Sequence, residues 1–150
     1  MSDFVLASSF EMSLRILLML DTLSDTMLDE EQITAIDFIA VYAADFGLLD
    51  ENLHGYGAYR YSEYPARRGL VAEAVRSLVL DRYIALNPDD DGYSFYITDL
   101  GKEVCRKLSS EYASEYRIAV DAVGESLNVH DALKMDSAIK DHALRSLKGV

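Results

Sequence analysis

The chain has 150 residues, half of them hydrophobic, which is enough for one compact domain with a substantial core. Its 26 acidic and 14 basic side chains give a net charge of −12, which argues against nucleic-acid binding by the free chain, because duplex affinity depends on Lys and Arg. The only cysteine, Cys105, excludes an internal disulfide and a cysteine-based zinc cluster. With no long apolar run and no basic leader, we expect a cytoplasmic protein without a membrane span.

Apolar residues at helical spacing predict three helices in the first half of the chain. The first should begin at about Ser9, and the second should follow the acidic segment 28–31 and end at Gly47, a natural C′ glycine. A loop rich in glycine and tyrosine precedes the third helix, which runs from about Ala66 to Val79. Gly69 falls inside this third helix, where we expect it to allow close helix packing.

Residues 81–108 carry the pattern that indicates the fold class. Two alternating runs flank the turn Pro-Asp-Asp-Asp-Gly at 88–92 and predict a β-hairpin. Thr98 should cap a fourth helix. The inner face of that helix should carry Leu100, Val104, Cys105 and Leu108.

Further helical patterns cover residues 111–127 and, more loosely, 129–147. The second places Val129, Leu133, Ile139, Ala143 and Leu147 on one side of a helix. The order of elements predicts a mainly α fold with a small β-hairpin (α+β), a winged helix-turn-helix with extra C-terminal helices. We expect residues 1–127 to form the winged-helix domain and its following helix, and residues 128–150 a helical tail suited to packing against a partner.

No pattern in the sequence indicates a catalytic, metal or cofactor site. The three histidines, His54, His130 and His142, lack the spacing of paired zinc ligands. The segment Gly55-Tyr56-Gly57 lacks the remaining parts of a phosphate-binding loop, and Cys105 lies on an apolar helix face that predicts a core residue. We therefore expect no enzyme activity, no metal and no cofactor.

The distribution of charge singles out one segment as a candidate contact site. Residues 21–52 hold nine acidic side chains and no Lys or Arg, whereas residues 53–82 hold five arginines against three acidic side chains. Tyrosine and arginine are enriched at the energetic centres of protein interfaces. The candidate partner-binding residues are Tyr56, Tyr59, Arg60, Tyr61, Glu63, Tyr64, Arg67 and Arg68.

Three interpretations of this segment remain open. It is a protein interface; or Glu63 pairs with Arg67 one turn away while the tyrosines cover the edge of the core; or the third helix reads nucleic acid. The aspartates at 89–91 argue against nucleic acid, because the tip of a wing lies beside phosphates and like charges repel.

Five segments carry a family resemblance: SSFEMSLRILLML (8–20), AIDFIAVYAADFG (35–47), LHGYGAYRYSEYPARRGLVAEAVRSLV (53–79), GYSFYITDLGKEV (92–104) and SSEYASEYR (109–117). In these segments the chain resembles the middle component of bacterial ABC three-component systems, the Lamassu-like antiphage and antiplasmid defence operons. The resemblance implies a noncatalytic adaptor that binds an SMC/Rad50-like ABC ATPase and an effector subunit, often a nuclease, and that reaches foreign DNA only through the complex. The alternative is a dimeric winged-helix DNA-binding transcription regulator.

Overall fold

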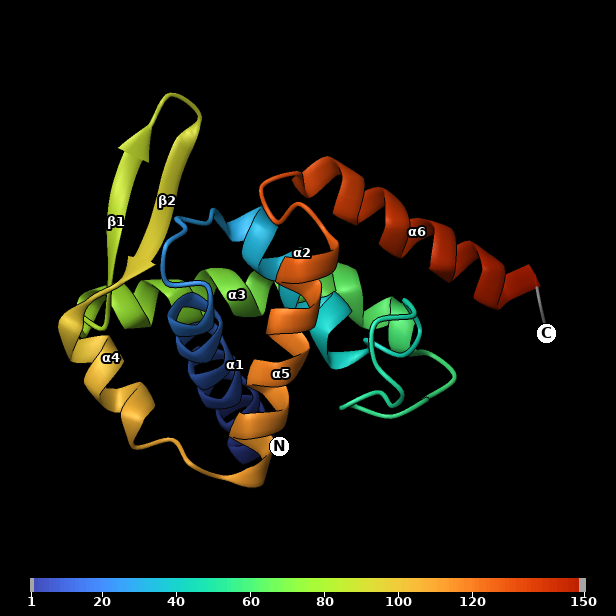
Figure 1. Ribbon diagram of the computed structural model, residues 1–150, viewed down its shortest axis with the longest axis horizontal. Coiled ribbons are helices and arrows are strands. Elements are labelled where there is room, and N and C mark those ends of the chain that lie inside the picture. The colour runs from blue at the N-terminus through green and yellow to red at the C-terminus, as the bar shows by residue number, and fades with distance from the viewer. Residues whose placement is uncertain (1, 149–150) are drawn as a thin grey trace.

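The computed structural model describes residues 2–148, and the side chains of residues 9–147. Within that range the chain forms six α-helices, a short 3-10 helix and one β-hairpin (Figure 1). The elements are α1 (Ser2–Thr22), α2 (Glu30–Val41), η1 (Arg60–Ser62), α3 (Glu63–Leu80), β1 (Ile84–Asp89), β2 (Gly92–Ile97), α4 (Asp99–Arg106), α5 (Glu111–Ser126) and α6 (Ala132–Lys148). The predicted mainly α fold with a small hairpin is confirmed.

The core lies where α1, α2, α3 and α5 meet. Every residue of α2 from 33 to 41 is buried, so α2 needs neighbours on all sides. Helices α1, α3, α5 and α6 all pack against it. In Figure 1 the hairpin projects from one end of this body, while α6 extends away at the other.

The predicted start of the first helix and the predicted end of the second helix need correction. Helix α1 already runs from Ser2, so Ser9 lies inside it, because nothing between them breaks a helix. Helix α2 begins as its acidic start predicts: the Asp29 side chain accepts a hydrogen bond from the Gln32 backbone N–H at 2.7 Å, and the Gln32 side chain accepts one from the Asp29 N–H at 2.9 Å. It ends at Val41 rather than near Gly47.

Gly47 has the left-handed conformation expected of a C′ glycine, but it lies in a turn after the end of α2. Its φ is 72°, its N–H donates to the Ala44 carbonyl at 3.1 Å, and the Leu48 N–H donates to the Ala43 carbonyl at 3.0 Å. This pair of bonds is a Schellman motif. The Asn52 side chain holds the same turn by accepting the Ala44 N–H at 2.8 Å, a contact that local helix signals do not reveal.

The predicted hairpin is present and is joined to the segment before α2. Its strands pair from Ile84 opposite Ile97 to Asp89 opposite Gly92, and the two aspartates between them form the turn. Leu28 extends the pairing, because its N–H donates to the Phe95 carbonyl at 3.1 Å and its carbonyl accepts the Phe95 N–H at 2.8 Å. The hairpin is therefore tied to the body by backbone bonds as well as by buried side chains.

Helix α4 confirms the predicted cap and corrects the predicted inner face. The Gly101 N–H donates to Thr98 Oγ1 at 3.1 Å, and Cys105 is buried one turn further on. Leu100, however, is 45% exposed, because it lies on a different face of the short helix from the buried Gly101 and Cys105.

The C-terminal residues pack on the body through α6. Val129, Met135 and Ile139 are buried, whereas Leu133 and Leu147 are 82% and 79% exposed, so the predicted single apolar side is wrong for these two leucines. Helix α6 lies against α2. The last two residues of the predicted tail, like Met1, lie outside the described residues. Over residues 2–148, no helix has both the length and the apolar character to cross a bilayer.

Two glycines give a paired test of the helix packing. At Gly69 an added Cβ meets nothing within 4 Å, so the expected close packing there is wrong, and Gly69→Ala should raise the free energy of unfolding by about 0.5–1 kcal/mol. At Gly101 an added Cβ would clash with the Tyr83 carbonyl oxygen and would lie 2.8 Å from Ile97 Cγ1. Gly101→Ala should therefore lower the free energy of unfolding by about 1–3 kcal/mol. Urea unfolding of both variants checks this; equal effects would contradict the packing described.

A buried ion cluster beneath the candidate partner surface

A single buried carboxylate, that of Asp37 on α2, connects four helices. Arg15 of α1 donates from Nε to Oδ1 at 2.9 Å and from Nη2 to Oδ2 at 3.2 Å. Arg67 of α3 donates from Nη1 to Oδ2 at 2.6 Å, and the hydroxyl of Tyr116 on α5 donates to Oδ1 at 2.6 Å. Asp37 and Tyr116 are fully buried, and the arginines are 6% and 5% exposed.

The cluster extends from Arg67 toward the start of α3. Arg67 Nη2 donates to Glu63 Oε1 at 3.0 Å, and the Tyr42 hydroxyl donates to the same oxygen at 2.9 Å. The Arg67 guanidinium also lies 5.3 Å from the centre of the Phe38 ring, within cation–π range. We refer to Arg15, Asp37, Glu63, Arg67 and Tyr116 together as the Asp37 cluster.

The surroundings of Asp37 keep it ionised. Burial alone raises the pKa of the carboxyl, but the two arginines and the hydrogen bonds from Arg15 and Tyr116 outweigh burial and hold the pKa well below its usual range. Burial and the adjacent carboxylate raise the pKa of the Tyr116 phenol. Because Asp37 already accepts four hydrogen bonds, the geometry suits joining helices and not receiving a proton from a substrate.

Four of the eight predicted contact residues are buried or half-buried, with their polar groups bonded inside the molecule. Arg60 Nε donates to Asp45 Oδ2 at 2.6 Å, and the Tyr61 hydroxyl donates to the same oxygen at 3.1 Å. The hydroxyl of Tyr64 reaches Asp136 on α6 at 2.9 Å. Arg67, in the Asp37 cluster, is the fourth. The pairing of Glu63 with Arg67 that one interpretation predicted is present.

The remaining four predicted residues, Tyr56, Tyr59, Glu63 and Arg68, are exposed. Tyr59 is the most open of the exposed tyrosines, with 83% of its surface accessible. We refer to Tyr59, Glu63 and Arg68, which lie at the beginning of α3 or just before it, as the α3 surface. The structure thus reduces the predicted patch to a smaller surface, on which partner binding stays a prediction.

The exposed charge of this region is balanced, although its sequence is basic. Since Arg60 and Arg67 are bound internally, the exposed charged side chains between residues 53 and 82 form two equal sets: Arg68, Arg76 and Arg82 against Glu63, Glu73 and Asp81. The basic island expected from the sequence is therefore not a basic surface.

Arg15, Asp37 and Tyr116 are absent from the predicted site, although the sequence pattern around the first two indicates a buried charge. Arg15 interrupts the apolar segment SLRILLML, and Asp37 interrupts AIDFIAVYA. A lone charge inside a helix that is otherwise buried on all sides requires an internal partner. Tyr116 has no such signal, because tyrosine is common on both buried and exposed helix faces.

Among the residues whose side chains are described, no group of histidine, cysteine, aspartate and glutamate is arranged to hold a metal ion. His54 Nε2 instead lies 2.6 Å from the Tyr112 hydroxyl, at the edge of the Asp37 cluster. Cys105 is buried, and burial raises the pKa of its thiol to about 11, which opposes formation of a reactive thiolate.

Replacing Asp37 by Asn should leave Arg15 buried without a counter-charge and Arg67 paired only with the half-exposed Glu63, and should lower the free energy of unfolding by about 3–5 kcal/mol. The matched control is Asp21→Asn, which removes an ion pair to Arg117 whose side chains are 23% and 31% exposed, and should change it by about 0–1 kcal/mol. Denaturant unfolding at neutral pH measures both. Equal losses would contradict the role assigned to the cluster.

The same pair of variants tests the pH dependence. The folded pKa of Asp37 lies below its ordinary value of 3.8, so its stabilising contribution is present above that pH and is lost as the pH falls below it. Asp37→Asn should remove this part of the acid dependence, whereas Asp21→Asn should retain it. Unfolding curves recorded from neutral to strongly acidic pH provide the measurement.

Comparison with known protein families gives a match that covers nearly the whole chain. The model of the family described as ABC-three component (ABC-3C) system Middle Component 2 matches residues 5–149. No curated protein and no solved structure matches the chain.

Proposed function

Since the chain belongs to the Middle Component 2 family of ABC three-component systems, we propose that it is a noncatalytic adaptor that binds an SMC/Rad50-like ABC ATPase. Membership makes it an accessory component of such a system, with further components as partners. In the proposal the adaptor also helps to control an effector, often a nuclease, within a cytoplasmic, Lamassu-like complex that acts against phages or plasmids.

The observation that carries this proposal is that the buried charged side chains pair with one another, while other charged side chains remain exposed on α3. In the Asp37 cluster the charges inside the molecule bind one another and fix the packing of α1, α2, α3 and α5. The body built by this packing exposes the α3 surface, whose tyrosine and two opposite charges are a composition suited to a protein interface.

The arrangement also supports the winged helix-turn-helix assignment as part of the proposal. Three helices precede a hairpin, and Leu28 pairs with Phe95 of the hairpin through a single β-bridge. In DNA-binding members of that fold α3 would be the recognition helix. Here its exposed charge is balanced and the hairpin tip carries exposed aspartates at 89–91, which favours a protein partner over the alternative of a DNA-binding regulator.

Co-expression with the ATPase and effector components of the same system tests the proposal. Arg68→Glu combined with Tyr59→Ala should weaken copurification by about tenfold or more, because it removes an exposed aromatic group and reverses a charge on the α3 surface. Arg67 is unsuitable for this test, because its substitution disrupts the Asp37 cluster.

The matched control is Arg76→Glu, which makes the same charge change at another exposed position of α3 and should leave the complex intact. Circular dichroism should show all variants folded. Failure of the wild-type chain to copurify with either component would refute the adaptor function. A specific DNA mobility shift by the purified chain alone would favour the regulator instead.

A further inference from the structure

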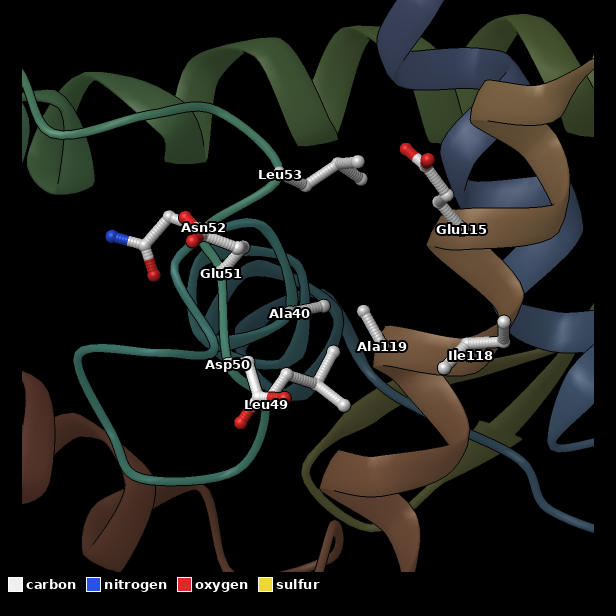
Figure 2. A pocket seen from close by; sticks show the side chains of 9 residues that line it. All are labelled: Ala40, Leu49, Asp50, Glu51, Asn52, Leu53, Glu115, Ile118 and Ala119. Carbon is white, nitrogen blue, oxygen red and sulfur yellow. The ribbon is translucent and has the colours of Figure 1, made fainter.

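A groove of about 320 Å³ lies between the loop 48–53 and helix α5, and none of the eight predicted contact residues lines it (Figure 2). Its floor is apolar and consists of Ala40 of α2 and Ala119 of α5, which are 0% and 1% exposed. Figure 2 shows Leu53 pointing from the loop toward α5 and Ala119 pointing from α5 toward the loop. Because these two alanines have almost no accessible surface, an inserted aliphatic side chain would contact Leu49, Leu53 and Ile118, which also line the groove.

Ile118, an exposed branched residue of α5, forms one wall of the groove. Ile118 is 59% exposed, although its neighbours along the helix, Ala119 and Val120, are buried. Leu49 and Leu53 on the loop side are partly buried and pack on the core. The groove thus presents apolar surface from two elements at one opening, which distinguishes it from a single exposed side chain.

Three acidic residues line the groove beside this apolar surface. Asp50 and Glu51 come from the loop and Glu115 from α5, and all three are exposed. Among the residues whose side chains the structure describes, no lysine or arginine lines the groove. Such a rim attracts a cationic group, repels phosphate, and would be satisfied by lysine or arginine on either side of an inserted aliphatic residue.

The loop side of the groove is held in place before any partner arrives. The Asn52 side chain accepts the Ala44 N–H at 2.8 Å and donates to the Gly55 carbonyl at 3.0 Å. The Tyr56 hydroxyl accepts the Asn52 N–H at 3.1 Å and donates to Glu51 Oε2 at 2.8 Å. A preformed loop loses little conformational entropy on binding, which favours its use as a docking site.

We propose that this groove is a docking site for a basic protein segment that inserts one aliphatic side chain between flanking lysines or arginines. The apolar surface of Leu49, Leu53 and Ile118 selects the inserted side chain, and the three carboxylates select the flanking charges. The inference deepens the proposed adaptor function and rests on it only for the existence of a protein partner. It assigns a second contact surface, separate from the α3 surface.

The test uses the full chain and two short peptides that share the same leucines, one with lysines at all other positions and one with glutamates. Methyl NMR should show saturable shifts at Ala40, Leu53, Ile118 and Ala119 with the lysine peptide and none with the glutamate peptide. Reversing the rim charges with Asp50→Lys and Glu115→Lys should weaken binding of the lysine peptide by at least about tenfold.

The matched control is Asp121→Lys, which changes the same charge at an exposed position of α5 that does not line the groove, and should weaken binding by less than about threefold. Ile118→Ala should weaken binding without altering the rim charge. Shifts spread over the acidic surface, or equal losses for the rim and control variants, would overturn the proposed site. The finding that a second copy of the chain occupies the groove in solution would also overturn the proposed site.

Copurification with the other components separates this inference from the proposed function. If the complex assembles but the groove variants bind the lysine peptide as the wild type does, the docking site is wrong and the adaptor function stands. If the groove binds the peptide specifically but no component copurifies, the adaptor function is wrong and the site stands.

Discussion

The packing of this protein depends on one buried carboxylate. Asp37 lies on the most enclosed helix, and its donors come from α1, α3 and α5, so satisfying it fixes the positions of three neighbours at once. A buried charge without partners would be strongly unfavourable, whereas two arginines and a phenol in good geometry offset that penalty. The cluster therefore selects one arrangement of helices, because an alternative packing would leave a charge unpaired.

This constraint changes how the charged residues of the chain are interpreted. Arginines close together in the sequence resembled a basic surface, but Arg67 is buried against Asp37, the half-buried Arg60 is paired with Asp45, and the exposed charges of residues 53–82 are balanced. Over the whole chain acidic side chains outnumber basic ones by 26 to 14, so the body presents an acidic surface with local apolar openings. A protein partner with complementary basic groups fits such a surface better than nucleic acid does.

Local features of the fold were predictable because their causes are local. The cap at Thr98, the acidic start of α2 and the turn between the strands each depend on side chains within a few residues of one another. The end of α2 and the exposure of Leu100 were not predictable in this way. The first depends on Asn52, which bonds to a turn eight residues earlier, and the second on which face of a short helix meets the body.

The sequence by itself determined the helices, the hairpin and their order, because periodicity, capping and turn residues act over short distances. The family is also shown by the sequence, through the match of its model to residues 5–149. Only the tertiary structure decided which of the charged and aromatic residues face solvent. Arg67 and Arg68 are neighbours in the chain, yet one is buried against Asp37 and the other is exposed. Successive residues of a helix point about 100° apart, so the neighbours that a helix meets, and not its composition, settle which side chain becomes an internal contact.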